Sequence, residues 1–177
     1  LQAELEKTFA VAFDPTHQAL AIYASHDDAL VMLRETAAAR SLHLDLRFCG
    51  CVDAIRALNE GRCHVAGFHA PWQPDAHSLV ASTYKPLLKP GQHKLIGFAT
   101  RAQGLMVAPG NPWRLQSLVD VAHAKVRYVN RSPGTGTRLL LDQCLQVLGL
   151  QTSDLKGYAH EENSHTAVAA CIAAGQA

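Results

Sequence analysis

The chain has 177 residues, of which 48% are apolar and 18% charged, and its 16 Lys and Arg nearly balance its 15 Asp and Glu. At about 150 residues per domain, this length predicts one domain or two small lobes. The composition excludes wholesale disorder, the formal charge of +1 gives no basic signature for nucleic acid, and no apolar run approaches the about 18–20 residues of a membrane span.

Residues 1–18 are predicted to be a connector that enters from an upstream domain. Leu1, Leu5 and Phe9 recur at a spacing of four, which is typical of a short amphipathic helix. We therefore expect a further domain, one that binds DNA, to precede this chain.

Residues 19–100 are predicted to form a first lobe. Apolar strands alternate with short helices at a pitch that favours parallel βαβ units. The strands are expected at 19–24, 42–48 and 64–68, and the helices at 30–40 and 52–58, the second ended by Gly61. Residues 71–92 contain four prolines and predict an irregular excursion, after which a strand is expected at 94–99.

Residues 101–177 are predicted to form a second lobe, which meets the first near residues 100–104. The expected elements are a strand at 105–108, a helix at 115–122, a strand at 126–129, a helix at 140–148 ended by Gly149, and a helix at 167–172 ended by Gly175. The fold class is therefore α/β, with two lobes that each contain a mostly parallel sheet flanked by helices.

The strongest local motif is VRYVNRSPGTGTR, residues 126–138. An apolar strand leads into a glycine-bearing loop at a helix N-terminus, where free N–H groups and the helix dipole favour an anion. Thr135 and Thr137 add hydroxyl donors, and Arg131 or Arg138 could add charge-assisted ones. The alternative is a capped helix after a tight turn, with Arg131 in solvent. The loop lacks the lysine of a P-loop and the third glycine of GxGxxG.

Two further strands end in the same manner as this one. Ser25 follows the first strand and Cys51 follows the second, each just before a helix. Because the carboxyl ends of strands line the ligand crevice of an open parallel sheet, Ser25, Cys51 and Thr135 could converge on one small anion. The alternative is that each residue only caps its own helix.

Catalytic constellations are not supported by the pattern, so no enzyme is expected. Ser25, His26 and Asp27 have the residue types of a triad, but neighbours in sequence cannot build the relay. Histidines 160 and 165 are five residues apart, so they do not share a helix face as in HExxH. His165, just before an apolar helix, is either an anion-facing donor or an ordinary surface residue.

The five cysteines are odd in number and scattered, at positions 49, 51, 63, 144 and 171. They do not form the even framework of a secreted disulfide protein, and no CxxC or closed ligand set predicts zinc. No basic-then-apolar signal peptide opens the chain. We therefore expect a cytoplasmic protein with no metal and no cofactor.

Several separated motifs resemble one particular family. They are ASHDDAL at 24–30, GCVDAIRALNEGRCHVAGFH at 50–69, RAQGLMVAPGNP at 101–112, VNRSPGTGTRLLLD at 129–142 and GYAHEENSHTAVAACIAAGQA at 157–177. Together they look like the periplasmic-binding-protein-like domain that is fused to helix-turn-helix regulators and commonly described as molybdate-binding. The resemblance covers the chain from about Ala19 onward, and it implies that a C-terminal return to the first lobe is missing here.

The resemblance implies a two-lobe type II solute-binding fold that closes on molybdate or tungstate. Matched to related tungstate-binding proteins, the anion contacts fall on Ser25, Cys51, Arg131, Thr135 and Thr137. The family usually has Ser or Thr in place of Cys51, and a thiol is a weaker donor than a hydroxyl. The full expected ligand-binding set is Ser25, His26, Cys51, Asn130, Arg131, Gly134, Thr135, Gly136, Thr137, Arg138 and His165.

These observations predict the ligand-sensing domain of a transcriptional regulator that binds an oxyanion between its lobes. Molybdate and tungstate accept hydrogen bonds only, whereas phosphate would need an acceptor for its proton; sulfate is not separated from them by sequence. The expected partners are the oxyanion and, through the absent domain, DNA, with no membrane and with homodimerisation left open. The alternative is the solute-binding receptor of an ABC-type oxyanion transporter.

Overall fold

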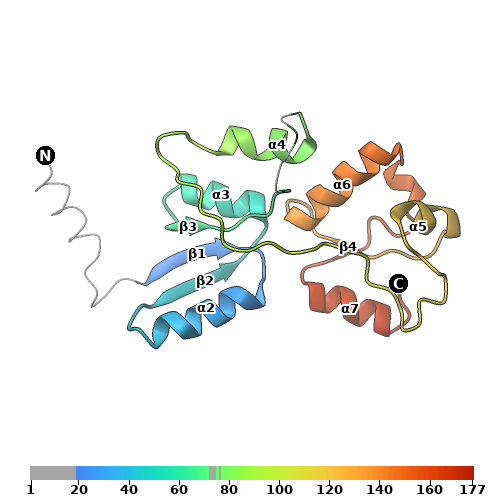
Figure 1. The fold of residues 1–177 in the computed structure, drawn as a ribbon, viewed down its shortest axis with the longest axis horizontal. Coiled ribbons are helices and arrows are strands. Elements are labelled where there is room, and N and C mark those ends of the chain that lie inside the picture. The colour runs from blue at the N-terminus through green and yellow to red at the C-terminus, as the bar shows by residue number, and fades with distance from the viewer. Residues whose placement is uncertain (1–18, 72–74, 76) are drawn as a thin grey trace, which may run out of the picture.

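The computed structural model describes residues 19–71, 75 and 77–177. The predicted connector at 1–18 lies outside the described residues. None of the helices in the described part combines the length and the apolar character that crossing a membrane requires. The described elements fall into two groups, each built around a small parallel sheet (Figure 1).

The first group contains a three-stranded parallel sheet in the order β2-β1-β3. Its strands are β1 (Leu20–Ala24), β2 (Leu44–Phe48) and β3 (Val65–Ala66), and its first two helices are α2 (Asp28–Ala38) and α3 (Cys51–Asn59). The central strand β1 is the most buried because it pairs on both sides. The βαβαβ order predicted from the sequence is confirmed, with β3 shorter than expected.

Helix α3 packs one apolar stripe against the sheet and buries it completely. Cys51, Ala54 and Ile55 are at most 1% exposed, and their spacing of three and four residues places them on one helix face. After the helix, Gly61 adopts a φ of +70°, the left-handed conformation that ends helices. This confirms the predicted helix end.

The segment 71–92 is more regular than its prolines suggested. Among its described residues it forms helix α4 (Leu79–Tyr84) and a short 3₁₀ helix (Lys85–Leu87). The Ser78 hydroxyl caps α4 by accepting a hydrogen bond from the Ala81 amide at 3.1 Å. Pro86 falls at the start of the 3₁₀ helix, where its missing N–H costs nothing. The prediction of an irregular excursion is therefore wrong for this part.

The strands predicted at 94–99 and 105–108 do not form. Residues 94–108 instead run as an extended ribbon from the first group to the second (Figure 1). Leu95, Ile96 and Phe98 are 65%, 81% and 58% exposed. Neither sheet of the described residues includes this extended segment as a strand. An apolar pattern alone does not make a strand, because a strand also needs a hydrogen-bonding neighbour.

The second group contains a two-stranded parallel sheet of β4 (Asn130–Arg131) and β5 (Glu161–Glu162). Its helices are α5 (Leu118–Ala124), α6 (Gly136–Leu148) and α7 (His165–Ala173), with a 3₁₀ turn at Thr152–Asp154. The strand predicted at 126–129 is displaced: ladder pairing begins only at Asn130. A core of Val121, Ala122, Leu141, Leu145 and Leu155 holds α5 and α6 together.

The predicted ends of the last two long helices are confirmed. Gly149 after α6 and Gly175 after α7 both adopt a φ of +68°, as expected for helix-ending glycines. Ser164 caps the start of α7 by accepting from the Ala167 amide at 3.0 Å.

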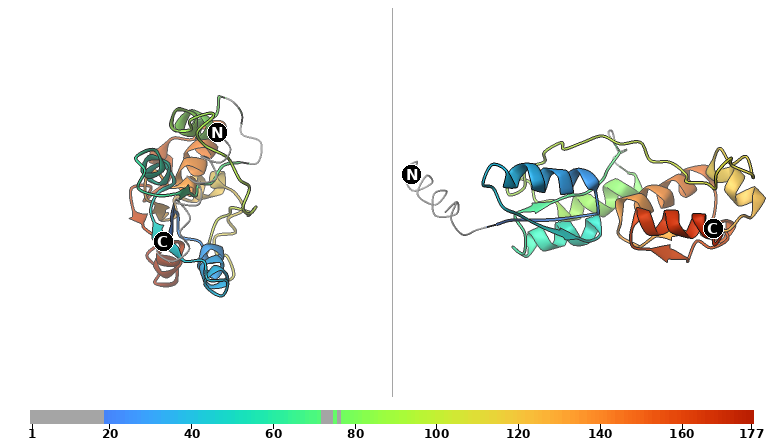
Figure 2. Two further views of the ribbon diagram at one scale, coloured as in Figure 1. Left: turned by 90° about the vertical axis from the view of Figure 1, so that its left-hand side faces the viewer. Right: turned by 90° about the horizontal axis from the view of Figure 1, so that it is seen from below.

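The two groups lie end to end (Figure 2), and two hydrogen bonds mark where they meet. Helix α4 packs on α6, where the Val80 amide donates to Gln143 Oε1 at 3.3 Å. At the start of α3, the Val52 amide donates to the Gly134 carbonyl at 3.2 Å. The second contact brings the two loops that carry most of the predicted ligand-binding residues together. The lobe boundary at 100/101 stays a prediction.

Candidate functional site

The structure brings three of the predicted residues together where the two groups meet. The Ser25 hydroxyl, just after β1, lies 3.3 Å from the thiol of Cys51 at the start of α3. A Cβ added to Gly136, at the start of α6, would lie 3.2 Å from the same sulfur and 2.7 Å from Cβ of His69. A strand end and two helix N-termini therefore converge on one point. Ser25 and Cys51 meet there as predicted, and the loop residue that the structure places there is Gly136, next to the predicted Thr135.

Thr135 serves as the cap of α6 inside the glycine-bearing loop. Its hydroxyl accepts a hydrogen bond from the Arg138 amide at 3.3 Å and donates to the Ser132 carbonyl at 2.8 Å. The side chain is only 7% exposed. The preceding Gly134 has a φ of +78°, and its carbonyl is turned toward the start of α3. Thr135 therefore caps α6, as the alternative interpretation of this loop predicted.

Arg131 carries the strongest electrostatic feature of the site. It is 5% exposed, and its guanidinium donates to two backbone carbonyls, those of Glu162 at 3.1 Å and Asn163 at 2.9 Å. Within residues 19–71, 75 and 77–177, no carboxylate forms an ion pair with it. Burial lowers the pKa of Arg131, because desolvation disfavours its charge. A buried cation without a counter-charge is costly, so the arrangement suits the binding of an anion.

Asn130 fixes the backbone from which Arg131 projects. It is 2% exposed; its side-chain nitrogen Nδ2 donates to the Tyr158 carbonyl at 3.2 Å, and its side-chain oxygen accepts from the backbone amide of Arg131 at 2.9 Å. With both ends of its side chain already bonded, Asn130 is placed to position Arg131 rather than to contact a ligand.

Histidines surround the buried guanidinium. Burial lowers the pKa of His69, and the nearby charge of Arg131 lowers it further. Burial is also the main cause that lowers the pKa of His165. The charges of Arg131 and Arg101 lower this pKa further, and His69 and His26 make the smallest contributions. The charge of Arg131 acts on both His69 and His165, so the two imidazoles lie in one region of positive potential. Both shifted imidazoles are neutral near pH 7, and a neutral imidazole still offers one N–H donor.

Two members of this group, His69 and Arg101, were not predicted as site residues. His69 lies three residues beyond β3, at the carboxyl edge of the sheet that also carries Ser25. The strand-end rule that selected Ser25 and Cys51 could therefore have selected His69 as well. Arg101 lies in the middle of the extended segment 94–108, where its guanidinium forms an ion pair with Asp27.

The remaining predicted residues are placed in different surroundings. The ring of His26 packs against Phe48, with 4.7 Å between the ring centroids. The Thr137 hydroxyl lies 3.3 Å from Gln103 Oε1, on the side of the ribbon.

Arg138 is turned away from the convergence point. Its guanidinium pairs with Asp142 at 3.2 Å and Glu161 at 2.9 Å and lies over the ring of Tyr158. It also donates to the Arg131 carbonyl at 3.2 Å. Since two carboxylates already balance its charge, this geometry suits a positioning role for Arg138 rather than the ligand contact predicted from the sequence.

The chemistry available at this point is hydrogen-bond donation and positive charge. The hydroxyl of Ser25 is hydrogen-bonded to a thiol, and no imidazole or carboxylate within the described residues contacts it. A nucleophile activated by a general base would require such a contact.

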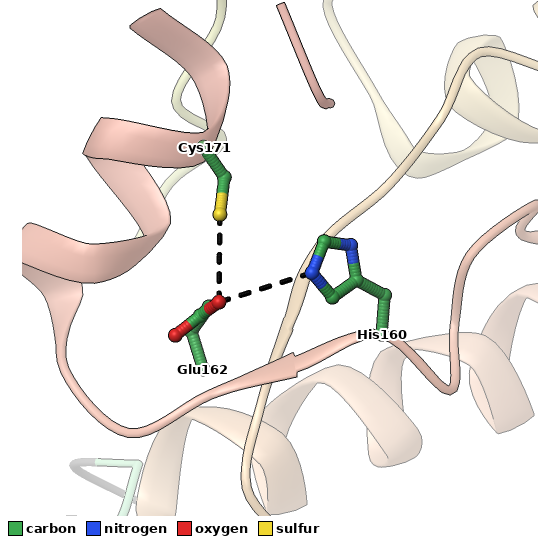
Figure 3. A group of neighbouring side chains, drawn as sticks. All are labelled: His160, Glu162 and Cys171. Atoms are coloured by element: carbon green, nitrogen blue, oxygen red, sulfur yellow. Dashed lines mark hydrogen bonds and ion pairs between the residues drawn. The ribbon is translucent and has the colours of Figure 1, made fainter. Parts of the chain in front are cut away.

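Two other features lie outside this point. A surface pocket of about 690 Å³ is lined by residues of α5 and of the 3₁₀ turn, among them Lys125, Asp154 and Lys156. Its charged side chains are of both signs and exposed to solvent, so the pocket has no buried, unpaired charge of the kind that Arg131 carries. Among the described residues, one group of metal-ligating side chains also occurs, formed by His160, Glu162 and Cys171 (Figure 3).

Comparison with known proteins identifies the family. The model of the PBP superfamily domain, the periplasmic-binding-protein-like fold, matches residues 33–177. A Bacillus subtilis (strain 168) protein called YvgK, itself uncharacterised, is 30% identical over 131 residues, which are 74% of this chain and 42% of that protein. The chain thus spans less than half the length of this relative. No solved structure matches. The chain belongs to the PBP superfamily domain family, whose members bind ligands.

Proposed function

We propose that this domain is the ligand-sensing part of a transcriptional regulator and that its ligand is a small oxyanion, molybdate or tungstate. The observation that carries the proposal is the buried guanidinium of Arg131, which has no acidic partner within the described residues. A dianion bound beside it would supply the absent counter-charge and accept its remaining N–H donors.

The groups around Arg131 are suited to an anion that only accepts hydrogen bonds. His69 and His165 offer imidazole N–H groups. The first turn of α3 has no side-chain cap; its Val52 amide donates to the Gly134 carbonyl, and the positive end of the helix dipole favours an anion there. The carboxylates near this edge include Asp27, which is paired with Arg101 and caps α2, and Asp53, which lies near Gly50 and pairs with Arg56. A protonated phosphate would need a free acceptor, whereas molybdate and tungstate do not.

The regulatory role rests on the resemblance to domains fused to helix-turn-helix proteins. In the proposal, the anion draws the two lobes together, and an upstream DNA-binding domain in the cytoplasm responds to that closure. The transport-receptor alternative uses the same site with a different partner. Gel-shift measurements on the full-length protein, with and without the anion, separate the two: a regulator changes its DNA affinity, and a receptor does not bind DNA.

Isothermal titration calorimetry tests the anion site directly. We expect the unmodified domain to bind molybdate or tungstate, and Arg131→Gln to lose at least tenfold in affinity, because one charged hydrogen bond is worth about 1.5–3 kcal/mol. Arg47→Gln is the matched control, since Arg47 is exposed on β2, where it pairs with Asp45 and lies over the ring of Tyr23. Thr135→Val should also weaken binding, because it removes the hydroxyl that fixes the loop.

The anion panel decides the ligand class. Titration with molybdate, tungstate, sulfate, phosphate and a molybdopterin-type compound compares size, charge and the need for an acceptor. A domain that gives no heat with any inorganic anion but binds the organic compound would overturn the oxyanion proposal. Turnover of a phosphorylated or carbonyl substrate that depends on His26 or His165 would overturn the non-catalytic role.

A further inference from the structure

A second cluster of chemistry-bearing side chains lies in the second group, around β5 and α7. His160 precedes β5, Glu162 lies on it, and Cys171 faces them from α7 (Figure 3). Glu162 Oε1 lies 3.8 Å from His160 Nε2 and 3.5 Å from the Cys171 sulfur. All three donor atoms lie within 4.8 Å of one another.

We propose that His160, Glu162 and Cys171 form a site for a divalent transition metal, with Zn²⁺ as the best match. Imidazole, carboxylate and thiolate are the three ligand types that zinc uses. Bond lengths of about 2.0–2.3 Å at tetrahedral angles place neighbouring ligand atoms about 3.3–3.8 Å apart. The two closest separations in the cluster already fall in this range, so the metal would enter with small side-chain movements.

The burial of the three residues leaves one coordination position for water. Cys171 is 8% exposed and forms the inner wall, whereas the His160 side chain is 44% exposed and faces solvent. Three protein ligands with an open fourth position are typical of zinc sites that hold a water molecule.

Metal binding exchanges a proton at the thiol. Without metal, the Cys171 thiol is hydrogen-bonded to Glu162, and burial together with that carboxylate raises its pKa. Binding replaces the S–H bond with a sulfur–metal bond and releases the proton to solvent, so no oxidant or reductant takes part. Affinity should therefore fall as the pH is lowered.

The cluster is connected to the anion site through the backbone of Glu162. The carbonyl of this residue, and that of Asn163, accept the hydrogen bonds of the Arg131 guanidinium. A metal that joins the Glu162 side chain to α7 would therefore fix the segment on which Arg131 rests. This geometry couples the metal to the position of Arg131, and the metal site itself does not require the anion proposal to be correct.

Titration of the domain with Co²⁺, in a non-thiol reductant and without any oxyanion, tests the site. We expect one equivalent to bind with a thiolate-to-cobalt charge-transfer band, which Zn²⁺ then displaces. Cys171→Ser should abolish the band, and His160→Gln, at a more exposed position that threatens folding less, should weaken the affinity ~10-fold or more. Cys144→Ser is the control, since Cys144 lies on α6 outside the cluster.

Two outcomes would overturn the proposal. One is the absence of a charge-transfer band in the folded, unmodified domain. The other is a band that persists in Cys171→Ser and His160→Gln but is lost in Cys63→Ser, which would place the metal among the cysteines of the first group. The metal titration contains no oxyanion, so its result does not depend on anion binding at Arg131. A failed anion titration would therefore leave this test intact.

Discussion

The close approach of α6 to α3 can be tested by adding one methyl group. Gly136 is the first residue of α6, and a Cβ there would lie 2.7 Å from Cβ of His69 and 3.2 Å from the sulfur of Cys51. The first distance is shorter than real Cβ contacts allow, and the opposing atom is held close to its own backbone. Gly136→Ala therefore forces the two groups apart where the candidate site lies.

The size of the effect follows from two opposing terms. Overpacking a tight contact costs about 1–3 kcal/mol, and alanine regains at most about 1 kcal/mol of helix propensity over glycine. We expect a net loss of about 1–2 kcal/mol in the free energy of unfolding, measured by urea denaturation. Gly104→Ala is the control, because a Cβ at Gly104 meets nothing within 4 Å. An alanine at 136 that leaves both stability and oxyanion affinity unchanged would refute the close approach described here.

Three further predictions follow from the site. His69 and His165 have lowered pKa values in the folded domain, so the unfolded chain binds more protons than the folded one as the pH falls through 6.5. Thermal unfolding of the free domain should therefore show falling stability from about pH 8 to 6. Bound anion should reduce this loss. Arg138→Met leaves two partly buried carboxylates unpaired and should cost about 2–3 kcal/mol by urea denaturation, with a cost near zero contradicting its positioning role. Cys51→Ser replaces a weak donor with a hydroxyl and should tighten anion binding up to about tenfold by calorimetry, whereas weaker binding would place the thiol outside the contact shell.

Local rules predicted the elements whose signals are local. The apolar run of β1, the buried stripe of α3 and the glycines that end α6 and α7 each depend on neighbours within a few residues, and the structure has them where the sequence placed them. The segment 94–108 differs, because its apolar pattern predicts strands only if a partner edge is present. Helix α4 was missed because its cap at Ser78 was outweighed by the surrounding prolines.

The candidate site shows the same division. The carboxyl-end rule for parallel strands anticipated that Ser25 and Cys51 would meet, and they do. Whether a given arginine faces a ligand or a carboxylate depends on residues far away in sequence. Arg131 and Arg138 are seven residues apart in one motif, yet only Arg138 finds acidic partners, one of them on β5. Asp142 is an i,i+4 neighbour of Arg138 on α6 and is a local signal, whereas the pairing with Glu161 depends on how β5 packs and is not encoded locally.

The most direct test of the central claim is the calorimetric comparison of Arg131→Gln with Arg47→Gln under titration with molybdate and tungstate. The account predicts binding to the unmodified domain, the same affinity within about twofold for the control, and a loss of at least about tenfold for Arg131→Gln. Equal affinity of Arg131→Gln and the unmodified domain would show that the buried guanidinium does not hold the anion, and it would contradict the proposed site.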